Sequence, residues 1–286
     1  MEKTALTVRA MQLSDIESAL KLSTAEGWNQ TEKDWKLLIG NPGNVCLLAE
    51  YGNKVVGTTT AIIYSNQLAW IGMVLVDKEY RGQGVSKLLL TSIFKKLAFR
   101  SIKLDATPAG QQVYKSFDFK DEYPILRMVN LSVRNSPSQD ANDVSEPMPL
   151  EDTRAIIALD EISFGVNRTP LIQFLLTEYP GKTELLKRNN RVTGFALGRH
   201  GSRYHHIGPV VALNAADAKM LVTNAINKLT NQPVVIDVPE DKEDLIAWLS
   251  SIGFVQQRYF IRMFIKENTF PGITARQYAI AGPEYG

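Results

Sequence analysis

The sequence of 286 residues predicts an α/β (α+β mixed sheet) protein built from two tandem copies of one fold. Each copy is expected to be a mixed, mostly antiparallel sheet flanked by helices. Strand-type and helix-type patterns follow one another through the first half in the order β-α-α-β-β-β-α-β-α-β. Short matches to the first half then recur in the second half at nearly constant spacing. We therefore expect domains at 1–134 and 150–286, joined by a linker at 135–149.

The first elements are a strand and two short helices. The sequence predicts the strand at Leu6–Ala10. Ser14-Asp15 can cap a helix that runs to about Ser23, because apolar residues follow on one side of that segment. A second short helix is expected at Thr31–Ile39, where Thr31 and Asp34 have the spacing of a capping box.

Strands and helices then complete the first half. The expected elements are strands at Val45–Tyr51, Lys54–Tyr64 and Leu68–Val76, a helix at Val85–Phe99, a strand at Ile102–Asp105, a helix at Ala109–Phe117 and a strand at Phe119–Val129. The early strands are joined by hairpins and should pair antiparallel, whereas the later ones alternate with helices and should pair parallel.

The second half carries diverged copies of four segments of the first. The matched pairs are Lys54–Gly57 with Arg191–Gly194 (191 − 54 = 137), Ile71-Gly72 with Ile207-Gly208 (207 − 71 = 136), Asp118-Phe119 with Gly253-Phe254 (253 − 118 = 135) and Arg127-Met128 with Arg262-Met263 (262 − 127 = 135). Matches in the same order at nearly the same offset indicate a tandem duplication. The segment between the halves is rich in Ser, Pro, Asn and Asp, as linkers are.

Composition and residue usage exclude several classes of protein. With 32 basic and 30 acidic residues, the net charge of +2 does not predict a nucleic-acid-binding surface. No apolar run is long enough for a membrane helix, and the first residues do not resemble a secretory signal, so we expect no membrane association and a cytoplasmic protein. Cys46 is the only cysteine and is interpreted as a buried strand residue rather than a nucleophile. No metal is expected, because the adjacent His205 and His206 should point to opposite faces of a strand.

The sequence predicts an anion-binding site at a glycine-containing turn that joins a strand to a helix. Gly82 and Gly84 let an anion approach the backbone, and the helix start offers unpaired N–H groups at the positive end of its dipole. A dinucleotide fingerprint is one alternative, since Asp105 lies 21 residues after Gly84 (105 − 84 = 21), but Lys87 stands where the third glycine is required. A tight turn that binds nothing is a second alternative, although one glycine would suffice for that.

The turn also resembles a family motif. Arg81-Gly82-Gln83-Gly84-Val85-Ser86 is similar to the pyrophosphate-binding motif Q/R-x-x-G-x-G/A of the GNAT superfamily of acyl-CoA-dependent N-acyltransferases, with Ser86 in the place of Gly or Ala. Tyr114–Phe119 is similar to the family's Y-x-x-x-G-F signature, with Asp118 where Gly is usual. The resemblance covers the first half of the chain and implies a tandem member of the family.

The resemblance implies a set of site residues. Strands Leu68–Val76 and Ile102–Asp105 would separate to admit acetyl-CoA. Tyr114 would protonate the departing thiolate. The sequence does not identify the base that takes a proton from the acceptor; Asp105, at a strand end, and Glu79, beside the turn, are the candidates. Trp28 and Asn29 would line the acceptor pocket. The expected acetyl-CoA contacts are Met73, Val74, Leu75, Val76, Arg81, Gly82, Gln83, Gly84, Val85, Ser86 and Lys87.

The implied function is transfer of an acetyl group from acetyl-CoA to a primary amine of a small molecule or to an amino group, by direct attack. A non-catalytic acyl-CoA-binding or sensor protein is the alternative. The second half resembles a degenerate acetyltransferase-like domain, because its turn at Ala212–Asp217 lacks both glycines and Leu249 stands where Tyr114 would (114 + 135 = 249). We expect it to bind no CoA. The sequence leaves the acceptor and the oligomeric state open.

Overall fold

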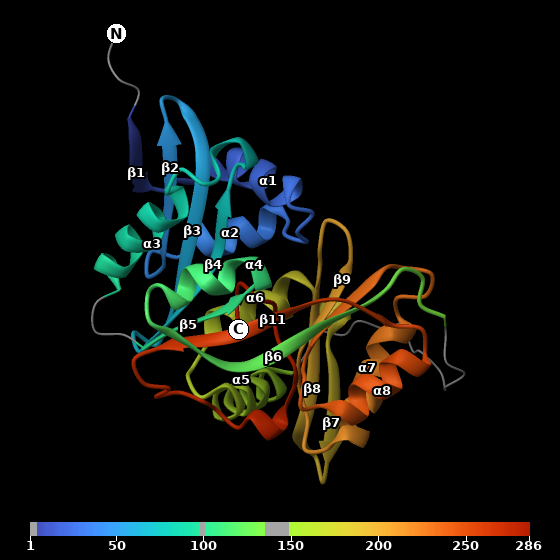
Figure 1. Ribbon diagram of the computed structural model, residues 1–286. Coiled ribbons are helices and arrows are strands. Elements are labelled where there is room, and N and C mark those ends of the chain that lie inside the picture. The colour runs from blue at the N-terminus through green and yellow to red at the C-terminus, as the bar shows by residue number, and fades with distance from the viewer. Residues whose placement is uncertain (1–4, 98–100, 135–148) are drawn as a thin grey trace.

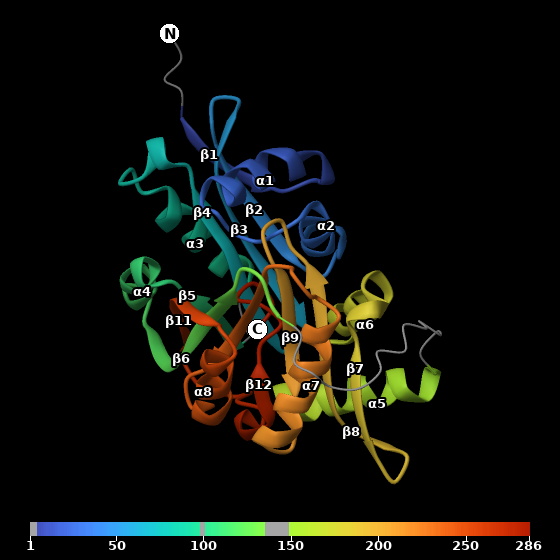
Figure 2. The ribbon, with the colours of Figure 1, turned by 90° about the vertical axis from the view of Figure 1, so that its right-hand side faces the viewer.

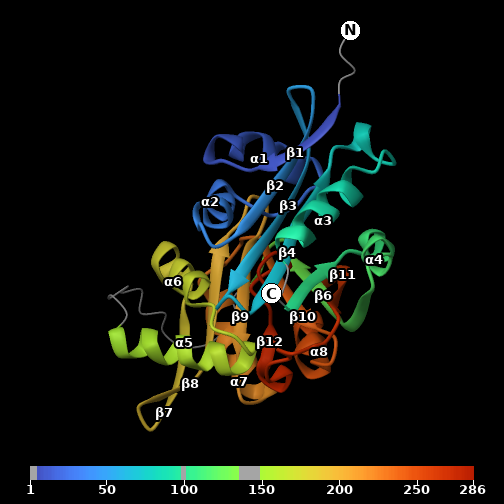
Figure 3. The ribbon, with the colours of Figure 1, turned by 90° about the vertical axis from the view of Figure 1, so that its left-hand side faces the viewer.

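A computed structural model describes residues 5–97, 101–134 and 149–286, in which twelve strands form one continuous sheet (Figure 1). The strand order is β1-β2-β3-β4-β5-β11-β6-β10-β9-β8-β7, and β12 pairs with β9 off this path. Helices α1 and α2 cover one face of β1–β4, and α3 covers the other face (Figure 3). The described residues contain no helix that is both long and apolar enough to cross a bilayer. Most of the expected linker lies outside the described residues.

The first half has the element order that the sequence predicts. Its elements are β1 (Leu6–Ala10), η1 (Leu13–Asp15), α1 (Ile16–Ala25), α2 (Glu32–Gly40), β2 (Val45–Tyr51), β3 (Lys54–Tyr64), β4 (Leu68–Val76), η2 (Lys78–Tyr80), α3 (Val85–Lys96), β5 (Ser101–Ala106), α4 (Pro108–Lys115) and β6 (Phe119–Asn130). The predicted bounds of β1 to β4 are confirmed. The capping box is also confirmed, with the Thr31 N–H donating to Asp34 Oδ2 at 2.6 Å.

The second half repeats this order from its first two helices onward. Its elements are α5 (Leu150–Phe164), α6 (Thr169–Glu178), η3 (Pro180–Lys182), β7 (Glu184–Arg188), β8 (Arg191–His200), β9 (His205–Val211), α7 (Ala215–Asn227), β10 (Val234–Pro239), α8 (Glu243–Ser251), β11 (Val255–Ile265), η4 (Thr274–Arg276) and β12 (Gln277–Ala279). The corresponding strands and helices support the duplication inferred from the sequence matches.

The halves exchange their last strands. β11, from the second half, lies between β5 and β6 of the first half and pairs antiparallel with both. β6 in turn pairs antiparallel with β10 of the second half. Figure 1 shows β6 and β11 side by side across the middle of the molecule. The two predicted sheets are therefore fused into one, which strand patterns alone do not reveal.

Reciprocal buried ion pairs accompany the exchange. Arg127 on β6 donates from Nε and Nη2 to both carboxylate oxygens of Asp237 on β10, at 2.7 Å each. Arg262 on β11 donates in the same way to both oxygens of Asp105 on β5, at 2.9 Å each. The two arginines are the pair matched by the internal repeat, and each binds the carboxylate of the other half.

The predicted separation of β4 and β5 is present. Their parallel pairing ends at Ile71 and Leu104, so the β5 side of the rest of β4 has no strand partner. A bulge follows at Met73, whose φ of 51° is rare for a residue with a side chain. The Thr58 hydroxyl donates to the Met73 carbonyl at 2.8 Å and holds the bulge in place.

The second half separates at the equivalent position, but its gap is filled. The β9–β10 pairing ends at Ile207 and Ile236. β12 enters there, pairing Gln277 with Val211, and the Ile280 N–H donates to the Asp237 carbonyl at 3.0 Å (Figure 2). The chain's own backbone therefore occupies the second gap.

The residues after β12 continue into the first gap. The Trp70 indole donates to the Pro283 carbonyl at 2.9 Å, and the Tyr285 hydroxyl donates to Asp34 Oδ1 at 2.9 Å. A Cβ on Gly72 would lie 2.9 Å from the Glu284 Cα, so the tail runs directly against β4. The tail therefore runs into the interior of the protein, where Tyr285 is fully buried.

The strand exchange predicts that neither half folds independently. Separated, β6 would lose both its strand neighbours, and Arg127 would be buried without Asp237. We expect two fragments divided within 135–149 to form a folded 1:1 complex when co-expressed and to aggregate when expressed singly. Light scattering and near-UV circular dichroism measure both outcomes. Two separately folded monomers that do not bind each other would contradict the exchange.

Candidate active site

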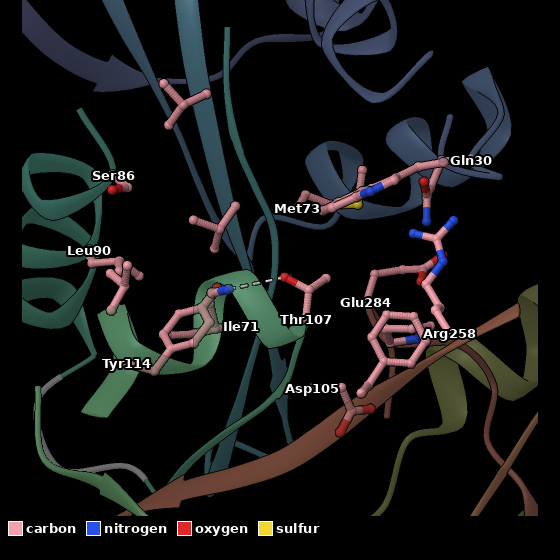
Figure 4. A pocket seen from close by; sticks show the side chains of 18 of the residues that line it. Gln30, Ile71, Met73, Ser86, Leu90, Asp105, Thr107, Tyr114, Arg258 and Glu284 are labelled. Carbon is pink, nitrogen blue, oxygen red and sulfur yellow. Dashed lines mark hydrogen bonds between the residues drawn. The ribbon is translucent and has the colours of Figure 1, made fainter. Parts of the chain in front are cut away.

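A cavity lies where β4 and β5 separate, and both halves of the chain line it. Figure 4 shows Ser86, Leu90 and Tyr114 on one side and Gln30, Arg258 and Glu284 on the other. The lining residues are Trp28, Gln30, Ile71, Gly72, Met73, Val74, Val76, Ser86, Leu90, Asp105, Thr107, Gly110, Val113, Tyr114, Arg127, Arg258, Phe260, Pro283 and Glu284.

The structure brings seven of the predicted site residues to this cavity. They are Trp28, Met73, Val74, Val76, Ser86, Asp105 and Tyr114. Leu75 and Val85 belong instead to the hydrophobic core. The remaining predicted contacts lie outside the cavity lining, with Arg81, Gly82, Gln83 and Gly84 on the turn between β4 and α3 and Lys87 in the first turn of α3.

The turn before α3 presents hydrogen-bond donors without protein acceptors. Gly82 and Gly84 have φ of 75° and 80°, a conformation in which glycine is favoured. The Leu88 N–H donates to the Gly84 carbonyl at 3.0 Å. In the described part of the chain, the N–H groups from Gly82 to Lys87 have no such partner. This arrangement suits a diphosphate, because aligned N–H groups and the helix dipole both favour an anion.

Tyr114 is held against the cavity by packing. Thr107 caps α4, accepting from the Gly110 N–H at 3.2 Å, and the Tyr114 ring contacts Phe119 with centroids 5.9 Å apart. The side chain is buried, and its hydroxyl makes no hydrogen bond to another described residue. Burial raises the pKa of the Tyr114 phenol, so this hydroxyl keeps its proton to a higher pH than an exposed tyrosine does.

Two predicted site residues, Asp105 and Asn29, form hydrogen bonds with residues of the second half that the sequence analysis did not predict. Both oxygens of Asp105 accept from Arg262, which leaves this carboxylate poorly suited to act as a base. Asn29 does not line the cavity: its Oδ1 accepts from the Arg203 and Tyr204 N–H groups, at 3.0 and 2.9 Å. The prediction for Asn29 needs correction, because this side chain joins the first half to the β8–β9 turn.

The second half supplies residues that the sequence did not identify. Arg258 and Phe260 come from β11, and Glu284 comes from the tail. Glu284 Oε1 accepts from Arg199 at 2.6 Å, and burial raises the pKa of this carboxyl while Arg199 opposes the rise. Glu284 Oε2 makes no close hydrogen bond to another described residue, although the Gln30 side chain lies near enough to lower the pKa of this carboxyl. No local motif marks these positions, because the strand exchange and the tail bring them to the cavity.

The equivalent turn in the second half is closed by its own side chains. Asn214 caps α7 by accepting from the Asp217 N–H at 2.9 Å, and the Asp217 carboxylate pairs with Arg188 at 2.6 Å. The adjacent histidines have different partners: His205 Nδ1 lies 3.0 Å from Lys182 Nζ, whereas His206 is buried with Nε2 3.8 Å from Asp237 Oδ2. Among the described residues, no group of three or more His, Cys, Asp or Glu side chains could hold a metal.

Comparisons with known proteins identify the class. Residues 12–119 match the acetyltransferase (GNAT) family model, and residues 156–279 match a second acetyltransferase (GNAT) domain model. Together with the separated strands and the glycine turn, these matches define an acyltransferase. The chain belongs to the GNAT superfamily and contains two GNAT domains in tandem.

Relatives share this organisation over most of their length. The holothin acyltransferase of Pseudoalteromonas sp. (strain SANK 73390) is 24% identical over 83% of this chain and 82% of its own. The uncharacterized N-acetyltransferase YitH of Bacillus subtilis (strain 168) is 22% identical over 84% of each. A crystal structure of a putative acetyltransferase from Pyrococcus horikoshii has the same fold, with a TM-score of 0.82, 22% identity and coverage of 100% of this chain and 98% of its own.

Proposed function

We propose that the chain transfers an acetyl group from acetyl-CoA to a primary amine of a small molecule or to an amino group, by direct attack. The observation that carries the proposal is the convergence of three features on one gap between β4 and β5. The first is the set of N–H groups at Gly82–Lys87, which have no acceptor among the described residues. The second is the edge of β4 beyond Ile71, where the described pairing with β5 has ended. The third is the buried Tyr114, which lines the cavity and whose pKa is raised by burial.

The residues divide the chemistry between the two sides of the cavity. The turn would bind the diphosphate, and the bulged backbone at Met73–Val76 would hold the acyl arm and polarise its carbonyl. The amine nitrogen bonds to the acetyl carbon, and the carbon–sulfur bond then breaks. Tyr114 would give its proton to the departing thiolate. We assign the proton acceptor to Glu284 rather than Asp105, because Glu284 retains an oxygen that makes no close hydrogen bond to another described residue.

The second half would take no part in binding CoA. β12 lies in its strand gap, and Asn214 accepts a hydrogen bond from a turn N–H that a phosphate would otherwise use. The second half would instead contribute β11 and the C-terminal tail, which form the wall of the cavity opposite Tyr114.

Gly84→Glu should abolish most acetyl-CoA binding. The substitution places a carboxylate where the diphosphate would lie, and the hydrogen bonds lost contribute about 1.5–3 kcal/mol each. We expect calorimetry to show an affinity at least about tenfold weaker. Gly84→Gln is the matched control, because it has the same length and the same unfavourable φ without the charge, and it should bind more tightly than Gly84→Glu. Undiminished binding in Gly84→Glu would rule out this turn.

Tyr114→Phe should lower kcat by about a hundredfold or more, with acetyl-CoA affinity almost unchanged. Phe keeps the ring contact with Phe119 and removes only the acidic proton. Because burial raises the pKa of Tyr114 above the usual tyrosine value of about 10, the wild-type rate should not fall between pH 9 and about pH 10.5 through loss of this proton. CoA release measured across that range tests both points, and a loss below about threefold would make Tyr114 a packing residue.

Titration of the intact chain should give one CoA per chain. The open turn of the first half would bind it, and the filled gap of the second half would not. Asn214→Ala removes the cap in the second half and should leave the stoichiometry at one, since β12 still fills the gap. Two equivalents in the wild type, with one lost in Gly84→Glu, would show that the second half binds CoA.

A further inference from the structure

Among the charged residues that line the cavity, Arg258 is the one that forms no ion pair with another described residue. Of the other charged residues lining the cavity, Arg127 pairs with Asp237, Asp105 with Arg262, and Glu284 with Arg199. Within the described part of the chain, no carboxylate lies within ion-pairing distance of Arg258, whose one hydrogen bond runs from Nε to Gln257 Oε1 at 3.3 Å. Its side chain is partly buried in the cavity wall.

The strand geometry directs Arg258 to the cavity and concentrates positive charge there. A bulge at Gln257 shifts the register of β11 between Gln256 and Arg258, which re-aims the following side chain. Arg258 then lies opposite Arg127 in the sheet. Asp237 forms its ion pair with Arg127, so Arg258 has no carboxylate in direct contact among the described residues. Burial and the neighbouring Arg127 lower the pKa of Arg258, which indicates that a bound anion would stabilise it.

The internal repeat shows that the fold does not require this arginine. The position 135 residues earlier is Tyr123 (258 − 135 = 123), which faces Arg262 as Arg258 faces Arg127. There a neutral hydroxyl accepts from Arg262 Nη1 at 2.8 Å. The same place in the sheet is thus filled by a hydrogen-bond acceptor in one half and by an unpaired cation in the other.

We infer that the acceptor carries, besides its amine, an anionic group (a carboxylate or a phosphate) that Arg258 binds. This inference rests on the proposed acetyltransferase function and names the class of its acceptor. Trp28 and Phe260 also line the cavity and supply apolar surface for such a molecule, whose amine would lie toward the gap between β4 and β5. Arg258 is therefore a specificity-determining residue contributed by the half that lacks the glycine turn.

Matched pairs of amines test this inference. The probes are 4-aminobutyrate against butylamine and O-phosphoethanolamine against ethanolamine, with CoA release as the readout. At least one anionic probe should exceed its neutral partner in kcat/KM by about tenfold or more, since hydrogen bonds to charged groups contribute about 1.5–3 kcal/mol. The two pairs separate a carboxylate from a phosphate. Arg258→Gln should remove the preference, and Arg258→Lys should keep part of it.

Controls separate this inference from the function on which it depends. Arg154→Gln, an equal loss of charge at an exposed position on α5, should change nothing. Equal turnover of charged and neutral amines would leave the acetyltransferase standing and overturn the inference. So would a preference that survives in Arg258→Gln. Calorimetry on CoA-saturated protein gives a readout independent of turnover: the favoured anion should bind wild type and not Arg258→Gln, and absence of binding by both anions would overturn the inference.

Discussion

Two reciprocal ion pairs, Arg127–Asp237 and Arg262–Asp105, constrain the rest of this structure. Each joins a strand of one half to the neighbouring strand of the other, with both carboxylate oxygens engaged and the groups buried. A buried ion pair contributes little net stability, but removing one partner leaves an isolated buried charge at a cost of about 3–5 kcal/mol. The two arginines occupy equivalent positions of the repeat, so a last strand returned to its own half would place Arg127 opposite Asp105 and Arg262 opposite Asp237. The pairs therefore specify the register of the last strands and require that one of them lie beside each carboxylate.

The exchange determines which residues can reach the first gap. Because β11 lies between β5 and β6, its cavity-facing side chains stand beside Tyr114 and the end of β5. The tail adds Glu284 against Gly72, a position where a side chain would collide with the tail backbone. A chain with two independent domains would have left this wall to the first half alone. The half with the glycine turn thus forms the wall of the cavity next to that turn, and the other half forms much of the opposite wall.

The sequence predicted what local patterns encode. Strand bounds in the first half, the capping box at Thr31 and the Gly82–Gly84 turn follow from side-chain alternation, capping chemistry and backbone freedom. Arg127 and Arg262 were noticed as a repeated pair, yet their partners were not, because pairing across the halves depends on strand order. The same reason explains the misassigned role of Asn29 and the omission of Arg258 and Glu284. Each of these side chains has its role set by segments more than 100 residues away or by an exchanged strand.

The C-terminal segment explains why the equivalent strand gaps of the two halves have different contents. Both halves separate their parallel strands after equivalent isoleucines, Ile71 and Ile207, so the duplicated fold makes the same gap twice. The ten residues 277–286 enter both: β12 fills the second gap, and the continuation forms part of the floor of the first. Filling one gap therefore fixes where the tail enters the other, because the Ile280 N–H is bonded to Asp237 only four residues before Glu284. The occupied second gap is thus part of what builds the first cavity, which gives a physical reason why a half without the glycine turn would be retained.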